Sequence, residues 1–307
     1  MIYVTQGHEL GIGIEVFLKS FSLLNSKQQK NICLIASLKS ITSNLDSLKI
    51  DYNYSNEVLR YNSNKLTLIE PQDSNLPQST TSLNLALSKI TEKDILLTLP
   101  TSKDQLIDND KLRKGYTEFL RYRFNKSNLC MVFKAYEDTT LLITDHIPLV
   151  EVSKSITTEK IKEKIEITLN GLNKYFNSIS EVIVAGINPH CGEGGLLGTE
   201  DEVIQPAIDQ IKSINVKGPF SGDTLHFYND LSKSQLKVYM FHDQGLPQFK
   251  DKYRTIGLNI TLGLPFLRMS VDHGTAFDLY GKGTADFSGC FYMLKEAIKV
   301  HRKILDE

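Results

Sequence analysis

The chain has 307 residues, of which 41% are hydrophobic and 23% charged, a composition typical of a globular protein with one large or two ordinary domains. Its formal net charge of -1 excludes a general electrostatic attraction to nucleic acid or to an anionic membrane. No apolar run approaches the roughly 20 residues of a membrane span, and the N-terminus lacks the basic and apolar regions of a signal peptide.

The cysteines lie too far apart in the sequence for the C-x-x-C spacing of structural zinc clusters and thioredoxin-type sites. The four are Cys33, Cys130, Cys191 and Cys290. We interpret them as reduced thiols, and we therefore expect the protein to be cytoplasmic.

In the N-terminal third, strands are expected to alternate with helices. A short apolar strand at 2–5 leads through a glycine turn at 7–13 into a helix at 14–24. Further strands are expected at 32–36, 65–69 and 94–100, and a helix at 80–90. Residues 37–64 are rich in Ser, Asn and Lys without strong periodicity, which indicates a weakly apolar, solvated segment for which we predict no particular helix or strand.

The same alternation continues through the rest of the chain. Strands are expected at 128–134, 140–144, 181–185, 236–241 and 256–261, followed by an apolar segment at 266–271. Helices are expected at 157–176, 200–212 and 287–304, and a turn entering a short helix at 218–225. The alternation predicts an α/β fold with mainly parallel sheets covered on both faces, arranged as two lobes that share a cleft.

One stretch, VAGINPHCGEGGLLGT at 184–199, places a buried strand before a glycine-rich turn and a helix start. This arrangement commonly binds a ligand in α/β proteins, because glycine lets backbone N–H groups approach it closely. The dinucleotide fingerprint G-x-G-x-x-G fails here because position 197 is Leu, and no P-loop motif occurs in the chain. A long surface loop is the alternative interpretation.

Three of the seven histidines follow apolar strands within the first residues of the next turn: His146, His190 and His242. Such strand ends gather at one edge of a parallel sheet, so three imidazoles could bind one divalent cation there. The neighbouring Asp145 and Asp243 could orient the rings. Taken singly, each histidine could instead be a capping or hydrogen-bonding residue.

Basic residues near these turns are candidate anion ligands: Lys103, Lys250 and Arg268. Arg268 stands out because it interrupts an apolar segment, PFLRMSV, and would need a partner if buried. Solvated surface charge is the alternative for the lysines.

Several strings together resemble the 4-hydroxythreonine-4-phosphate dehydrogenase family of pyridoxal phosphate synthesis. They are DHIPL, GINPHCGEGGLLGTED, GPFSGDTL, FHDQGLPQFK and NITLGLPFLRMSVDHGTAFDL, in the family's order, with weaker similarity in GHELGIGIE and LTLPTSK. The resemblance implies a two-lobed fold like that of isocitrate and isopropylmalate dehydrogenases, with a central cleft. On this basis we expect one lobe at 1–125 plus 255–307, and a second at 126–254 that carries the metal ligands and the dimer contacts.

The resemblance also implies a set of site residues and cofactors. Metal ligands match His146, His190 and His242; substrate-binding positions match Tyr116, Thr117, Asp223, Lys250, Asn259 and Arg268. We expect Asp243 or Lys103 to transfer the proton, and Gly192, Gly194, Gly195 and Gly198 to face NAD or NADP. One divalent metal (Zn, Mg or Co) per active site and a homodimer with a shared active site are implied as well.

The implied reaction is metal-dependent oxidation of 4-phosphohydroxy-L-threonine by NAD(P), with decarboxylation to 3-amino-2-oxopropyl phosphate. Two departures from the family pattern put the substrate in question: Tyr116 replaces a histidine, and His8 and Glu9 replace the aspartate and proline of the N-terminal motif. The alternatives are a related dehydrogenase of threonate or erythronate 4-phosphate, a metal hydrolase, and a non-catalytic binder of phosphorylated ligands.

Overall fold

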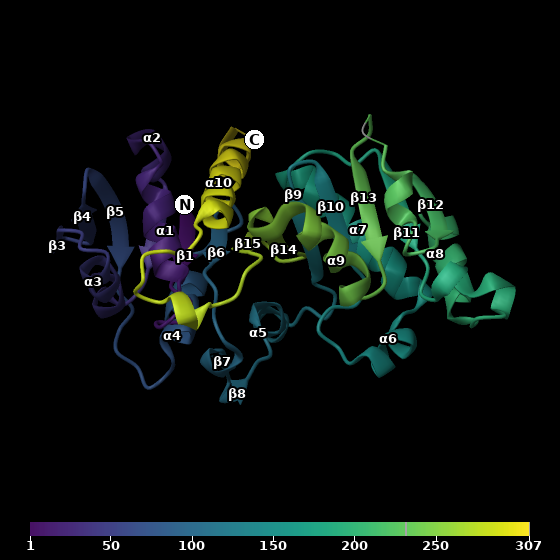
Figure 1. Ribbon diagram of the computed structural model, residues 1–307, viewed down its shortest axis with the longest axis horizontal. Helices are drawn as coiled ribbons and strands as arrows, with labels where there is room; N and C mark the ends of the chain where they lie inside the picture. Colours follow the sequence, from purple (N-terminus) through teal and green to yellow (C-terminus); the bar gives the residue numbers. More distant parts are fainter. Residues whose placement is uncertain (231, 307) are drawn as a thin grey trace. The chain divides into compact units, whose positions relative to one another are not determined.

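A computed structural model describes residues 1–230 and 232–306 of the chain, shown in Figure 1. The chain divides into two compact units: a first unit of Met1–Lys126 and Leu264–Glu307, and a second unit of Ser127–Gly263. Residues 255–263, which we expected in the first lobe, therefore belong to the second unit, because the strand they contribute pairs within the second unit's sheet.

The sheet of the first unit has the strand order β15-β6-β1-β2-β5-β4-β3. The bounds are β1 Ile2–Thr5, β2 Ile32–Ile35, β3 Tyr52–Ser55, β4 Val58–Tyr61, β5 Asn64–Ile69, β6 Ile95–Thr98 and β15 Leu267–Val271, with a separate ribbon of β7 Ile107–Asp108 and β8 Lys111–Leu112. The five strands from β15 to β5 run parallel. All residues of β2, β6 and β15 are buried, as expected for parallel strands covered on both faces.

Helices of the first unit pack on these strands. They are α1 Gly13–Ser22, α2 Ser26–Gln29, α3 Leu38–Ser47, α4 Gln78–Lys89, α5 Tyr116–Arg123 and α10 Ser288–Asp306, with short 3-10 turns η1 Lys103–Gln105 and η6 Phe277–Leu279. Helix α10 packs on β15 and on α1, and Figure 1 shows it beside α1. Helix α4 packs on β1 and β2. Within the described residues, no helix combines the length and apolarity that crossing a membrane requires.

The segment 37–64, which we expected to be solvated, contains α3, β3 and β4 and buries part of its apolar side chains. Helix α3 buries Ile41 and Leu45 one turn apart, although the residues between them are polar. Strands β3 and β4 form an antiparallel hairpin whose turn residues, Asn56 and Glu57, both have a positive φ. The segment therefore folds through two apolar helix positions and a tight turn, features too sparse to give a periodic pattern.

The sheet of the second unit has the order β12-β11-β13-β10-β9-β14. The bounds are β9 Cys130–Ala135, β10 Asp138–Leu142, β11 Glu181–Ala185, β12 Asn215–Phe220, β13 Gln235–Tyr239 and β14 Leu258–Leu262. Strands β12, β11, β13 and β10 are parallel neighbours, whereas β9 is antiparallel to both β10 and β14. With its helices, this sheet confirms the predicted α/β class with mainly parallel strands.

Helices cover both faces of this second sheet. They are α6 Leu149–Ser155, α7 Thr158–Tyr175, α8 Ile204–Gln210 and α9 His242–Tyr253, with 3-10 turns η2 Pro189–Gly195, η3 Glu200–Val203, η4 Leu225–Tyr228 and η5 Arg254–Ile256. Helix α9 packs Leu246 and Phe249 against Phe133 of β9, while α7 reaches Cys130 through the carbonyl of Lys164. Alternate residues of a strand point to opposite faces, so α7 and α9 lie on opposite sides.

Two elements of the second unit differ from expectation. Residues 218–220, expected in a turn, end the strand β12, because an edge strand tolerates Pro219 where a central strand would not. Residues 242–253, for which we expected no helix, form α9 despite Gly245 and Pro247. Its apolar Leu246 and Phe249, at helical spacing, are buried in the core and stabilise it there.

Candidate active site

The three candidate metal ligands follow three neighbouring parallel strands of the second unit. His146 comes after β10, His242 opens α9 directly after β13, and His190 lies in η2 after β11. Strand β13 pairs with both β10 and β11. The histidines therefore follow the carboxyl ends of adjacent strands, where ligand sites of α/β sheets form.

His146 and His242 lie side by side, with ring centroids 5.4 Å apart. The Asp243 carboxylate is 2.6 Å from Nδ1 of His242, which leaves Nε2 of that ring directed elsewhere. Asp145 instead accepts a hydrogen bond from the backbone N–H of His146, at 2.9 Å. One carboxylate thus orients an imidazole in the way that metal-binding histidines are commonly oriented.

His190 is held by different contacts. Its backbone N–H donates to the Ser221 hydroxyl at 3.3 Å, and that hydroxyl donates to Asp223 at 2.6 Å. Its Nδ1 lies 2.7 Å from Glu193. The hydrogen bond and charge of Glu193, with a smaller effect of Asp223, raise the pKa of His190. Asp223 thus lies beside His190, within the predicted site.

The described residues do not form a complete metal site within one chain. Among residues 1–230 and 232–306, no three His, Cys, Asp or Glu side chains are grouped closely enough to hold a metal ion. The adjacent imidazoles of His146 and His242 supply two nitrogen ligands of the kind that divalent transition metals prefer. Binding of one cation by all three histidines stays a prediction.

The glycine-rich turn after β11 has an unusual backbone. Five consecutive residues, 190–194, have φ between 45° and 77°, the left-handed region that costs non-glycine residues roughly 1–2 kcal/mol each. Asp201 supports this turn by accepting backbone hydrogen bonds from Ile187 at 2.7 Å and Asn188 at 3.1 Å. Its carboxylate is buried against Gly186, where any added Cβ would lie 2.6 Å from Oδ1.

The four glycines expected to face a dinucleotide fall into two pairs. Gly192 is buried, and a Cβ there would lie 2.4 Å from the carbonyl oxygen of Gly198, so these two close the turn on itself. Gly194 and Gly195 are exposed, with open space around the first and an ordinary contact near the second. Gly194 and Gly195 are thus the most open of the four, and the dinucleotide contact stays a prediction.

In the first unit, Arg268 is buried in β15 beneath the ring of Tyr116. Its guanidinium lies 5.1 Å from the ring centroid, and its Nε donates to the Thr98 hydroxyl at 3.1 Å. Burial lowers the pKa of Arg268 to about 10. The Tyr116 hydroxyl donates to the carbonyl of Leu99 at 3.0 Å.

The remaining predicted residues lie on both units. Thr117 is buried in α5 next to Tyr116, and Lys103 opens η1 on the surface, after β6. Lys250 is exposed in the last turn of α9, and Asn259 is half-buried in β14. The first unit therefore holds Lys103, Tyr116, Thr117 and Arg268, and the second holds the histidines, the aspartates, Lys250 and Asn259.

Sequence reasoning missed three residues that position the site: Asp201, Ser221 and Gln244. Gln244 accepts from the backbone N–H of Met240 and donates to the carbonyl of Gly186, at 2.8 and 2.7 Å. It thereby ties the start of α9, which carries His242, to the end of β11. Its position two residues after His242 was the available signal.

The N-terminal departure from the family pattern is accommodated locally. The backbone N–H of His8 donates to the carbonyl of Pro100 at 2.9 Å, and its Nδ1 accepts from Leu10 at 3.0 Å. The His8 ring meets Phe277 edge-on, with centroids 4.7 Å apart. Gly7 is required before it, because a Cβ there would lie 2.4 Å from the Pro100 carbonyl oxygen.

The fold places the chain in a known class. The isocitrate dehydrogenase of Methylococcus capsulatus has a similar fold, with a TM-score of 0.51 over 99% of this chain and 87% of that one at 11% identity. The protein is therefore an α/β protein with an isocitrate dehydrogenase-like fold. More particularly, residues 15–300 match the family described as pyridoxal phosphate biosynthetic protein PdxA, and the chain belongs to that family.

Individual relatives agree with this assignment. A 4-hydroxythreonine-4-phosphate dehydrogenase of Hydrogenobaculum sp. is 33% identical over 95% of this chain and 96% of its own. A putative D-threonate 4-phosphate dehydrogenase of Oceanobacillus iheyensis is 31% identical over 98% and 97%. A 4-hydroxythreonine-4-phosphate dehydrogenase of Enterobacter sp. is 40% identical over 67% of this chain, and the match spans only 64% of that relative.

Solved structures carry the same name. The structure of a 4-hydroxythreonine-4-phosphate dehydrogenase from Klebsiella pneumoniae has a TM-score of 0.74 at 25% identity, covering 98% of this chain and 99% of its own. One from Burkholderia phymatum has a TM-score of 0.72 at 29% identity, covering 98% and 97%. The similarity therefore extends over essentially the whole chain.

Proposed function

We propose that the protein oxidises 4-phosphohydroxy-L-threonine with NAD or NADP, and that the product decarboxylates to 3-amino-2-oxopropyl phosphate. The observation that supports this most directly is the full-length similarity to the Hydrogenobaculum dehydrogenase. The side-by-side imidazoles of His146 and His242 at a strand-end edge agree with a metal-assisted dehydrogenase.

A divalent metal, Zn, Mg or Co, would be held by His146, His190 and His242. Bound there, it would stabilise the negative charge that develops on a substrate oxygen. The chain's own residues bind and orient the substrate: Arg268 and Lys250 attract its phosphate or carboxylate, and Thr117, Asn259 and Asp223 hydrogen-bond its polar groups. Tyr116 supports Arg268 from the ring side.

Proton transfer is assigned to Asp243 or Lys103. Asp243 already hydrogen-bonds His242, so its removal would also release that imidazole. Lys103 would act alone from η1. The variants Asp243→Asn and Lys103→Met separate the two roles: loss of the transfer group shifts the pH profile of kcat, whereas loss of a positioning group lowers metal content as well.

The decisive experiment supplies the purified chain with 4-phosphohydroxy-L-threonine and either dinucleotide, and follows reduced dinucleotide and released carbon dioxide. We expect activity that EDTA abolishes and added Zn, Mg or Co restores. Metal content, measured by mass spectrometry, should fall in His146→Ala and His242→Ala. Full activity in metal-free protein would disprove the metal role, and absence of any dinucleotide reduction would disprove the dehydrogenase assignment.

A second candidate is oxidation of D-threonate 4-phosphate, favoured by the full-length similarity to the Oceanobacillus protein and by Tyr116. A panel with threonate and erythronate 4-phosphates, compared by kcat/KM, decides between the substrates. Stabilisation by these ligands without turnover would instead indicate a non-catalytic binder, and turnover without dinucleotide would indicate a hydrolase.

We further propose that the chain acts in the cytoplasm as a homodimer formed through the second unit. Four large apolar side chains next to the histidine segments are exposed there: Leu149, Val150, Leu196 and Leu197. Exposed apolar residues grouped in this way are typical of subunit interfaces. Light scattering should give twice the chain mass, and Leu149→Asp with Leu196→Asp should give the mass of a single chain.

A further inference from the structure

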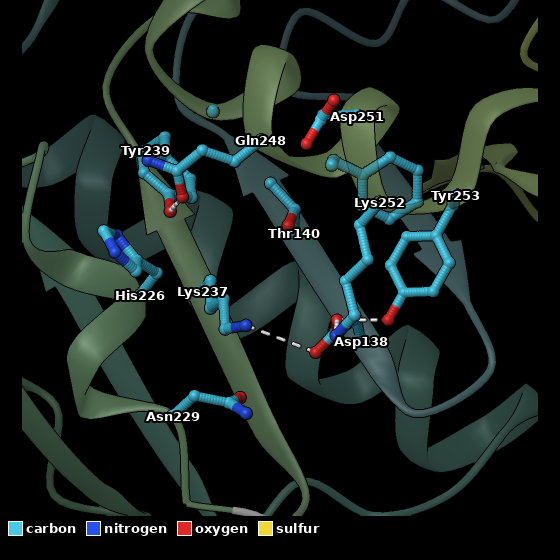
Figure 2. Close-up of a pocket in the computed structure, with 12 residues that line it drawn as sticks. Asp138, Thr140, His226, Asn229, Lys237, Tyr239, Gln248, Asp251, Lys252 and Tyr253 are labelled. Atoms are coloured by element: carbon cyan, nitrogen blue, oxygen red, sulfur yellow. Dashed lines mark hydrogen bonds and ion pairs between the residues drawn. The ribbon is translucent and has the colours of Figure 1, made fainter.

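The second unit contains a pocket on the sheet face under α9, whose polar side at Asp138 lies at the start of β10, whereas the histidines follow the carboxyl ends of the strands. Its volume is about 300 Å³, enough for a small ligand of one ring. Asp138 begins β10, and Lys237, in the middle of β13, pairs in register with Thr140. Figure 2 shows their side chains on neighbouring strands, with Lys252 and Tyr253 of α9 beside Asp138.

The Asp138 carboxylate accepts hydrogen bonds from three donors on the wall of this pocket. Asp138 accepts from Lys237 at 3.2 Å and from Lys252 at 2.6 Å, and the Tyr253 hydroxyl donates to it as well. Two ammonium groups against one carboxylate leave a local charge of about +1. The other acidic lining residue, Asp251, is exposed on α9 and is drawn apart from the Asp138 cluster in Figure 2.

Hydrogen-bond donors exceed acceptors here. Lys237 uses one of its three N–H groups on Asp138, and its side chain is only 13% exposed. Over the described residues, 1–230 and 232–306, the structure gives no hydrogen bond to the Thr140 hydroxyl or to the Asn229 side-chain amide. Asp138 is already engaged three times, so the spare donors are suited to an anionic ligand with several oxygens.

The other walls are aromatic. Phe249 and Tyr239 belong to the buried core and present their rings to the pocket, and Tyr253 packs on Phe249 with centroids 5.1 Å apart. Flat apolar walls of this kind favour a planar ring. The Gln248 side chain, which accepts from the Tyr239 hydroxyl at 3.3 Å, lies at the same wall.

We propose that this pocket binds a small aromatic compound carrying a phosphate or a carboxylate. Its anionic group contacts Lys237, Thr140 and Asn229, and its ring lies against Phe249 and Tyr239. The site is separate from the strand-end edge that carries the histidines, and the proposal stands independently of the dehydrogenase assignment.

The test measures binding to the full chain by calorimetry, with phenyl phosphate and benzoate as ligands. Inorganic phosphate and benzamide supply the anion or the ring alone, and each should bind at least tenfold more weakly than the compound that combines them. The stronger of phenyl phosphate and benzoate identifies the anion. Absence of measurable binding by both would overturn the proposal.

Two variants locate the site. Lys237→Met and Asn229→Ala should each weaken binding at least tenfold, whereas Lys233→Met, which removes a lysine paired with Glu181 outside the pocket, should not. If Lys237→Met does not fold, Asn229→Ala decides alone, since its side chain makes no hydrogen bond among the described residues. Unchanged affinity in Asn229→Ala, or loss of binding in Lys250→Met instead, would place the ligand elsewhere and disprove the proposal.

Discussion

At the residue scale, the hydroxyl and the ring of Tyr116 make two different contacts. Tyr116 donates to the carbonyl of Leu99, whose residue is fully buried, while its ring covers the Arg268 guanidinium. The hydroxyl is therefore engaged with the protein, and the aromatic face rather than the hydroxyl is what Arg268 meets. This contact gives Tyr116 a supporting role that its position in the sequence alone does not reveal.

We predict that Tyr116→Phe destabilises the protein by about 1–2 kcal/mol, because the buried Leu99 carbonyl loses its partner while the ring is retained. Urea unfolding followed by circular dichroism measures this. Tyr122→Phe, whose residue is 59% exposed, is the matched control and should change stability by less than about 0.5 kcal/mol. Equal effects of the two changes would contradict the assigned role.

Asp201 acts at the same scale on the segment that carries His190. Its carboxylate accepts two backbone N–H groups of the turn. We predict that Asp201→Ala costs about 1–3 kcal/mol and speeds amide exchange across residues 187–199, because those partly buried donors lose their acceptor. Hydrogen-exchange mass spectrometry measures this, with the exposed Glu202→Ala as control. Unchanged exchange in Asp201→Ala would disprove the prediction.

At the scale of elements, the approach of α9 to β13 depends on Gly245. A Cβ at this position would lie 2.7 Å from the Tyr239 ring, which is buried and cannot move aside freely. Helix propensity favours Ala over Gly by up to about 1 kcal/mol, but a clash with a rigid ring costs more.

We therefore predict that Gly245→Ala destabilises the protein by roughly 1–3 kcal/mol despite the gain in helix propensity. Thermal unfolding measures the change. Gly274→Ala is the control, since an added Cβ there meets nothing within 4 Å. A stabilised Gly245→Ala variant would show that α9 can shift away from β13.

At the scale of the whole molecule, one buried carboxylate couples the second unit to pH. Hydrogen bonding from Lys217 lowers the pKa of Glu181 to about 2, with smaller contributions from Gln235 and Lys233; together they outweigh the opposing effect of burial. A lowered pKa means that the folded state favours the ionised form. This stabilisation is complete above the ordinary pKa of 4.5 and is lost as the pH falls from 4.5 toward 2.

We predict that Glu181→Gln removes about 1–2 kcal/mol of stability at neutral pH and flattens the loss of stability on acidification. This free energy is smaller than the full pKa shift would give, because Lys217 and Lys233 are partly exposed and solvent screens their charges. Urea titrations at a series of pH values measure both effects. Glu202→Gln, which alters an exposed carboxylate of the same unit, provides the comparison. A parallel pH dependence in wild type and Glu181→Gln would contradict the prediction.

The sequence predicted those features that depend on local apolar runs. Helix α7 was clear because Ile161, Ile165 and Leu172 recur at helical spacing and are buried. The positions of the histidines after strands could be predicted as well, because each follows an apolar run that ends in a turn. The adjacency of β10, β13 and β11 could not, since strand order depends on long-range packing.

Other features depend on contacts between residues far apart in the sequence, which a local sequence pattern cannot predict. The left-handed run at 190–194 persists because Asp201, eleven residues after the start of the run, binds the preceding backbone. Strand β12 forms at an edge, where Pro219 is tolerated. The pairing of Lys237 with Asp138 joins residues 99 positions apart. These contacts are visible only once the chain has folded.

Strand β12 also bears on whether the protein aggregates at high concentration, because it lies at the edge of its sheet. A strand at the border of a sheet offers backbone groups to any extended chain that meets it, and this is how fibrils start. Pro219 has no N–H to offer, and the Lys217 side chain, 47% exposed, places a charged residue on the same border. Pro219, which made a turn the expectation at this position, is thus also a residue that keeps the strand from pairing with further chains.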